Sequence, residues 1–207
     1  MNLVVVDAGM GNLRSVERAL EEAARRVSQS VKLTRSGDPN VVRAADVVVF
    51  PGQGAFRDCA RALDGGLREA ITGSIAAGKP YLGLCLGLQA LFATSEEAGE
   101  SCRGLAIYGG TVRKLEGAPG VKIPHMGWNT VEPERRGGLL GDSAEHYYFV
   151  HSFVVVPSDP SLAAGTTEHG SRFVSAVERD NVFATQFHPE KSQSAGLSLL
   201  GRFLERA

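Results

Sequence analysis

One cysteine of the chain stands in a sequence context that predicts a nucleophile. Cys85 lies in the segment GLCLGLQ, and Gly83 and Gly87 flank it two residues away on each side. The apolar run YLGL precedes this G-x-C-x-G pattern, and the helical pattern LGLQALF follows it. A sharp strand-to-helix turn of this kind exposes the central side chain, and the two glycines remove Cβ atoms that would clash. The helix behind the turn would favour the thiolate and aim backbone N–H groups at an oxyanion.

A thiolate nucleophile needs a base that accepts its proton and a third group that orients the base. The segment QFHPEKS provides candidates for both roles in His188 and Glu190. Pro189 favours an extended conformation at His188, and residues two apart in an extended segment project to the same side. We therefore expect Glu190 to contact the imidazole of His188, and His188 to accept the proton of Cys85.

The other cysteines and histidines lack such surroundings. Because free cysteine is often a core residue, Cys59 and Cys102 are expected to pack in the interior, which is also the alternative for Cys85. The expectation for His151 is a binding or structural role, and for the remaining histidines a structural or surface role: His125, His146 and His169.

No metal, cofactor or nucleotide site is predicted. The chain has no HExxH, CxxC or HxxxH pair, so a zinc site would need scattered ligands. The glycine-rich turns AGMGN and PGQG match neither GxGxxG nor GxxxxGKS.

The order of apolar runs indicates an α/β fold. The 207 residues predict a single domain, 1–207. Strand and helix patterns alternate in the first half, which favours an open, mostly parallel sheet covered by helices on both faces. After residue 104, short β-type stretches predict antiparallel additions in the C-terminal half, with a turn at Asp180 and Asn181. The expected strands and helices of the first half, and the terminal helix, are 2–7, 13–27, 31–34, 46–50, 67–77, 81–84 and 197–204.

Charge and composition exclude several classes of partner. The formal net charge of −1 leaves no basic surplus that would attract nucleic acid or anionic lipid. No apolar run approaches the roughly 20 residues that span a bilayer, and the first residues do not resemble a secretion signal. The three cysteines fit a reducing compartment, so we expect a cytoplasmic protein without membrane or nucleic-acid partners.

Three blocks in order, PGQG, GLCLGLQ and QFHPEKS, resemble those of the class I (triad) glutamine amidotransferases. Four further segments, DAGMGNLRSV, PGQGAF, PHMGWN and YYFVHSF, are similar to the members of this family that work with a cyclase in histidine biosynthesis. The resemblance covers almost the whole chain.

This resemblance implies that Cys85, His188 and Glu190 form a triad that hydrolyses glutamine to glutamate and ammonia. The oxyanion would bind the backbone N–H of Leu86 and that of Gly52 or Gln53, and this choice stays open because Gln53 replaces a more usual small apolar residue. The substrate itself would be held by Gln89, Ser152 and Phe153.

The resemblance also implies a partner, a (β/α)₈-barrel cyclase subunit that receives the ammonia in a 1:1 heterodimer. Its contact surface on this chain would comprise Asn12, Met126, Trp128, Tyr148 and Lys191. Ordinary aromatic packing is the alternative for Trp128 and Tyr148. Two rival functions are a free hydrolase such as a γ-glutamyl peptidase, which needs an open cleft and no partner, and an inactive binding protein. The complete triad argues against the second.

Overall fold

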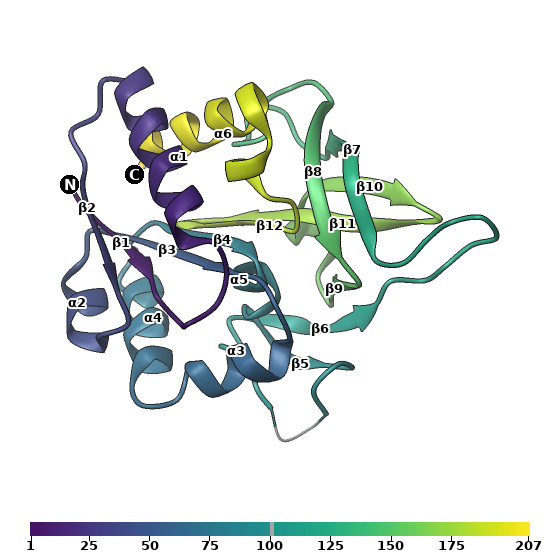
Figure 1. Ribbon diagram of the computed structural model, residues 1–207, viewed down its shortest axis with the longest axis horizontal. Helices are drawn as coiled ribbons and strands as arrows, with labels where there is room; N and C mark the ends of the chain where they lie inside the picture. Colours follow the sequence, from purple (N-terminus) through teal and green to yellow (C-terminus); the bar gives the residue numbers. More distant parts are fainter. Residues whose placement is uncertain (100–101) are drawn as a thin grey trace.

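A twisted sheet runs through the whole molecule, with helices on both of its faces (Figure 1). The computed structural model describes residues 1–99 and 102–207. Within them the strands of the main path follow the order β2-β1-β3-β4-β12-β11-β10-β7-β8. These strands are β1 (Asn2–Val6), β2 (Lys32–Ser36), β3 (Val47–Gly52), β4 (Tyr81–Cys85), β7 (His125–Pro133), β8 (Glu145–His151), β10 (Ala163–His169), β11 (Ser171–Arg179) and β12 (Val182–Thr185).

The sheet is parallel in its first half and antiparallel in its second. Pairings from β2 to β12 are parallel, whereas β12, β11, β10, β7 and β8 pair antiparallel in succession. A short branch of β5 (Phe92–Ser95), β6 (Tyr108–Lys114) and β9 (Phe153–Pro157) joins the sheet at β11. The predicted fold class is confirmed, as is the turn at Asp180, which adopts the left-handed φ of 52°.

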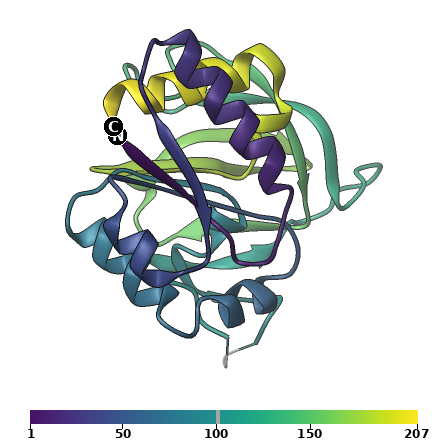
Figure 2. The ribbon, with the colours of Figure 1, turned by 60° about the vertical axis from the view of Figure 1, so that its left-hand side comes forward.

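The apolar runs of β1, β3 and β4 are buried because both faces of the sheet are covered. Leu3 and Val5 face the helices α1 (Leu13–Arg26) and α6 (Gln193–Arg206), while Val4 and Val6 face the other helical layer. That second layer contains α2 (Pro39–Ala44), α3 (Phe56–Ala62) and α4 (Leu67–Ala76) (Figure 2). The 3₁₀ turns η1 (Pro160–Leu162) and η2 (Pro189–Lys191) complete the elements. None of the described helices is long and apolar enough to cross a membrane.

Several boundaries differ from the sequence prediction. The helix expected over LGLQALF is the single turn α5 (Leu86–Gln89), and the chain then forms β5. Backbone carbonyls that would continue the helix accept bonds from a later segment instead, including Leu105 N–H to Ala90 O at 2.6 Å. The terminal helix predicted over 197–204 is present but longer, because α6 begins at Gln193 and ends at Arg206. The short elements α2, α3, β5 and β10 were not predicted.

Candidate active site

Cys85 lies on a strained turn between β4 and α5. Its φ of 53° and ψ of −97° belong to a region that non-glycine residues rarely adopt. A Cβ on Gly83 would come within 2.6 Å of the Gly87 carbonyl oxygen, and one on Gly87 would overlap the carbonyl of Phe50. The two glycines thus have the steric role that the sequence predicted, and they let the turn fit tightly against β3.

His188 and Glu190 form a buried pair in the loop that follows β12. His188 Nδ1 lies 2.8 Å from Glu190 Oε1, and both side chains are at most 3% exposed. Burial by itself lowers the pKa of His188, but interactions with Cys85 and with Glu190 outweigh burial and raise it to about 9. His188 Nε2 is buried without a hydrogen-bond partner in the described residues. This nitrogen is therefore free to exchange a proton with the thiol.

The backbone of His188 is fixed by strand β8. His188 N–H donates to the carbonyl of Tyr148 at 2.9 Å, and the hydroxyl of Ser192 donates to the carbonyl of His188 at 2.6 Å. The same hydroxyl accepts the backbone N–H of Tyr148 at 2.9 Å. Tyr148 thus binds the N–H of His188 directly and is linked to the carbonyl of His188 through Ser192.

The PGQG loop lies against both the turn and the base. A Cβ on Gly52 would come 2.8 Å from Leu86 Cβ, so the loop approaches α5 closely only because this residue is glycine. Gln53 Nε2 lies 3.5 Å from His188 Nδ1. Because the Nδ1 hydrogen faces Glu190 and Gln53 Nε2 can only donate, the two nitrogens are in contact without forming a hydrogen bond.

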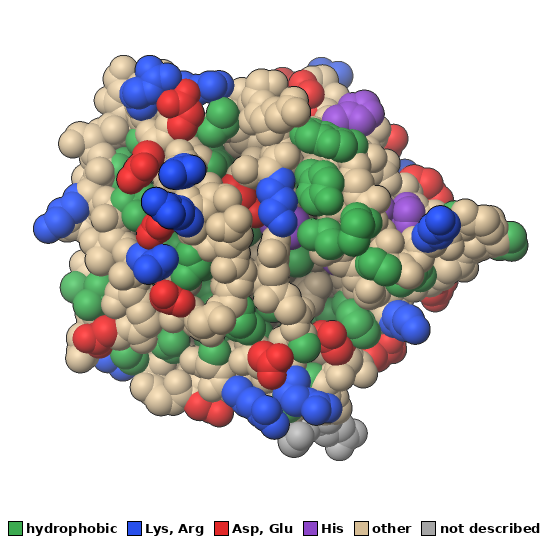
Figure 3. Space-filling model, viewed as in Figure 1, with side chains coloured by type: hydrophobic (Ala, Val, Ile, Leu, Met, Phe, Trp, Pro, Cys, Tyr) green, Lys and Arg blue, Asp and Glu red, His purple; other side chains and the backbone are tan. Residues whose placement is uncertain are grey.

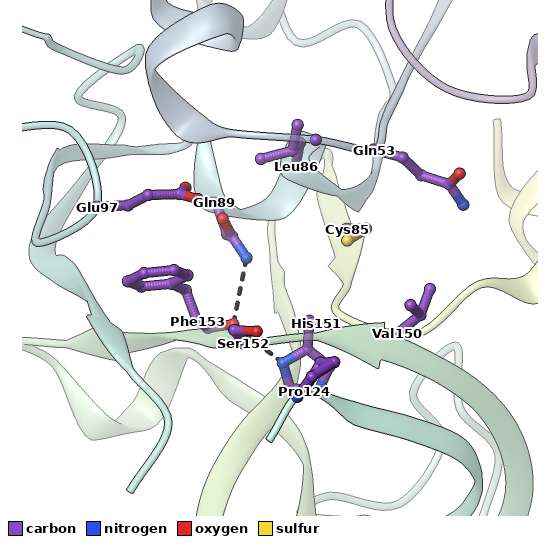
Figure 4. A pocket seen from close by; sticks show the side chains of 11 residues that line it. Gln53, Cys85, Leu86, Gln89, Glu97, Pro124, Val150, His151, Ser152 and Phe153 are labelled. Carbon is purple, nitrogen blue, oxygen red and sulfur yellow. Dashed lines mark hydrogen bonds between the residues drawn. The ribbon is translucent and has the colours of Figure 1, made fainter. Parts of the chain in front are cut away.

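A pocket of about 280 Å³ opens in front of the sulfur of Cys85 (Figure 4). The amide of Gln89 extends toward the same pocket and donates to the Phe153 carbonyl at 3.2 Å. The residues that line this pocket are Gln53, Gly54, Cys85, Leu86, Gln89, Glu97, Pro124, Val150, His151, Ser152 and Phe153. Of the two candidates for the second oxyanion donor, Gln53 is in this set and Gly52 is not.

Two polar residues beside the pocket were missed by sequence reasoning. Glu97 places a carboxylate in its wall, and Glu97 Oε2 accepts the Phe56 N–H at 2.7 Å. Gln186 is fully buried and its Nε2 lies 3.5 Å from the sulfur of Cys85. No local pattern marks Glu97, whereas Gln186 stands two residues before His188 and extended-chain alternation could have indicated it.

The side chains expected at a partner surface gather mainly over β7 and β8, where Figure 3 shows clustered hydrophobic groups. Met126 and Trp128 are 63% and 48% exposed. The rings of Trp128 and Tyr148 lie 6.2 Å apart, and Lys191 Nζ lies 5.9 Å from the centre of the Tyr148 ring. Asn12 caps α1, which packs against η2. These large exposed apolar side chains are typical of a contact surface.

The remaining thiols, and the remaining histidines other than His151, lie outside the pocket lining. Cys59 is buried in α3, and burial raises its pKa to about 12, so it is an unreactive core thiol. Cys102 is half-buried and outside the pocket lining. His125 and His151 are buried cross-strand neighbours, His169 stacks on His125, and His146 is exposed. Residues 1–99 and 102–207 contain no group of three metal-ligand side chains.

The fold and this site define an amidotransferase, and the chain belongs to the glutamine amidotransferase class I family, whose model matches residues 4–207. It is an enzyme family. The chain is 49% identical to the imidazole glycerol phosphate synthase subunit HisH of Nitrosomonas europaea over 99% of this chain and 98% of that protein. It is 48% identical to the subunit of the same name from Syntrophotalea carbinolica over 97% and 98%. A crystallised glutamine amidotransferase has the same fold, with a TM-score of 0.71 and 20% identity over 98% of this chain and 97% of that chain.

Proposed function

We propose that this protein is the glutaminase subunit of imidazole glycerol phosphate synthase and acts in the cytoplasm. One observation carries the proposal: a strained cysteine lines the pocket and interacts with a buried histidine–glutamate pair, in a chain that matches such subunits over 99% of its length. The enzyme hydrolyses glutamine to glutamate and ammonia, and the ammonia passes to a cyclase subunit.

Cys85 is the proposed nucleophile. Its thiol proton moves to His188 Nε2, and the sulfur forms a bond to the side-chain amide carbon of glutamine. His188 returns the proton to the departing nitrogen, the carbon–nitrogen bond breaks, and ammonia leaves a glutamyl thioester. Water then attacks the thioester, yielding glutamate and restoring the thiol. Glu190 holds the imidazole and stabilises its charged form.

The oxyanion of each tetrahedral intermediate is proposed to bind the backbone N–H of Leu86 and that of Gln53, both of which line the pocket. Loss of one such donor typically costs roughly 10²- to 10³-fold in rate. Gln89 with the backbone of Ser152 and Phe153 would bind the amino-acid end of glutamine. Glu97 supplies a negative charge suited to the substrate's ammonium group.

The cyclase is proposed to be a (β/α)₈ barrel bound in a 1:1 heterodimer. It would use the ammonia to form imidazole glycerol phosphate and an aminoimidazole carboxamide ribonucleotide. The exposed side chains of β7 and β8 support this docking surface: Met126, Trp128 and Tyr148, with Lys191 and Asn12 beside them.

The decisive experiment compares glutamate release by the chain alone and with the cyclase and its nucleotide ligand. We expect slow hydrolysis by the isolated chain and a strong increase when both are added. Full activity from the chain alone, unaffected by the partner, would instead establish a free hydrolase.

Labelling with the glutamine analogue diazo-oxo-norleucine tests the nucleophile. Modification is expected at Cys85 and not in Cys85→Ala, whereas Cys59→Ala serves as a matched control and should label normally. Unchanged turnover in Cys85→Ala would refute the assignment.

A further inference from the structure

Gln186 connects the nucleophile to the wall of the substrate pocket. Its side chain is fully buried, and its Nε2 lies 3.5 Å from Cys85 Sγ. Its Oε1 accepts from Gln89 Nε2 at 3.3 Å. The proposed mechanism assigns this residue no step, yet it is a polar group directly against the reacting atom.

The orientation of the Gln186 amide follows from its neighbours. Gln89 Nε2 donates to the backbone carbonyl of Phe153, which can only accept, so the Gln89 nitrogen must face that way. The same nitrogen faces Gln186. If the amide of Gln186 were reversed, two N–H₂ groups would face each other. The oxygen of Gln186 therefore faces Gln89, and an N–H faces the sulfur.

The Phe153 carbonyl is itself fixed by a chain of hydrogen bonds from strand β7. His151 Nδ1 donates to it at 3.0 Å, His125 Nδ1 donates to His151 Nε2 at 3.0 Å, and Asn129 Nδ2 donates to His125 Nε2 at 3.2 Å. Each neutral imidazole donates once and accepts once, so all directions in the chain agree. The carbonyl thus uses both lone pairs, one for His151 and one for Gln89 (Figure 4).

We propose that Gln186 is a catalytic residue whose N–H donates a hydrogen bond to the sulfur of Cys85, which stabilises the thiolate and aims it at the pocket. This role rests on the proposed function, because it assumes that the sulfur is the nucleophile. The donor complements His188: the imidazole removes the proton, and the amide donates to the negative sulfur that remains.

The expected effect is modest and measurable. Sulfur is a weak acceptor, but a hydrogen bond to a charged group stabilises that charge more than a neutral bond does. We expect loss of the hydrogen bond from Gln186 to change the ionisation equilibrium of the Cys85 thiol about tenfold, which moves its midpoint by about one pH unit.

The test is the rate of iodoacetamide alkylation at Cys85 as a function of pH, read by mass spectrometry of the full-length chain without glutamine or partner. Gln186→Met keeps much of the side-chain volume and removes the donor. We expect its alkylation midpoint to rise by about one pH unit and its rate at neutral pH to fall about tenfold. Ser175→Ala is the matched control, because Ser175 is equally buried and its hydroxyl bonds only Thr167 among the described residues.

An unchanged midpoint in a folded Gln186→Met protein overturns the proposal, as does an equal shift in Ser175→Ala. If Gln186→Met does not fold by circular dichroism, Gln186→Asn gives the same test, since its shorter side chain withdraws the amide from the sulfur. Glutamine turnover with the cyclase adds a second readout: kcat should fall about tenfold, whereas a change confined to KM would assign Gln186 to substrate binding. Because alkylation needs neither glutamine nor cyclase, its result stands apart from the test of the proposed function.

Discussion

The buried pair of His125 and His151 should make the fold sensitive to mild acid. Burial lowers the pKa of His125 to about 4 and that of His151 to about 3, with smaller contributions from neighbouring histidines. In the unfolded chain both regain a pKa near 6.5. The unfolded state therefore binds more protons than the folded state between these values, so stability must fall as the pH falls below about 6.5.

The size of this loss follows from linkage. One proton of difference changes the unfolding free energy by about 1.4 kcal/mol per pH unit. Between pH 6 and pH 5 each unfolded histidine is on average about 90% protonated, while the folded pair stays neutral, so the two together cost about 2.5 kcal/mol. That is a large fraction of the roughly 5–15 kcal/mol that stabilises a typical domain.

Other shifted groups leave this pH window clear. Arginine partners lower the pKa values of Glu22 and Asp159 to about 2, and a hydrogen bond from Thr166 lowers that of Glu134. These carboxylates reduce stability mainly as the pH falls below their unfolded values near about 4. The raised pKa of His188 has the opposite sign, because its contribution is complete below about pH 6.5 and is lost as the pH rises toward 9.

The assay is urea unfolding followed by circular dichroism at pH 6 and pH 5. His125→Phe preserves ring stacking on Phe149, at 4.5 Å between centroids, and removes one titrating group. Its loss between the two pH values should be about half that of the native protein, near 1.2 kcal/mol. His146→Gln, on the exposed surface, controls for the removal of a histidine. Equal pH dependence in His125→Phe and the native protein would refute the reasoning.

Three further predictions concern the turn and the base. Gly87→Ala forces a Cβ onto the Phe50 carbonyl and should cost about 3 kcal/mol or prevent folding, measured by thermal denaturation. In Cys85→Ala the pKa of His188 should fall below about 9, because the interaction with the Cys85 side chain, which raises it, is gone; histidine NMR titration measures this, and an unchanged pKa would contradict it. Ser192→Ala should lower kcat about tenfold with the fold intact, through loss of a buried hydrogen bond of about 1.4 kcal/mol to the His188 carbonyl. Turnover equal to that of the native protein would show that His188 keeps its position without this bond.

Local geometry made the tight turn at Cys85 predictable from the sequence. The glycines around Cys85 are needed by the geometry of one turn, and the spacing of His188 and Glu190 reflects a few adjacent peptides. Strands such as β3 are buried on both faces, so their continuous apolar sequence was enough to predict them.

Contacts between distant segments were harder to predict. Glu97 reaches the pocket because β5 replaces the helix expected there, and that depends on bonds from residues 104–108. His125 and His151 meet only through the register of two strands, which no spacing reveals. Short helices such as α2 and α3 have too few turns to show an amphipathic period.

The attachment of His188 to Tyr148 has a consequence for protein design. Strand β8 pairs only with β7 in the described part of the sheet, so the backbone of the candidate base is hydrogen-bonded to an edge strand. Grafting only the side chains of the proposed triad onto another scaffold would leave out that support. The smallest portable unit of the candidate site is therefore the turn at Cys85, the loop of His188 and Glu190, and the β7–β8 hairpin, with the hydroxyl of Ser192 joining that loop to β8.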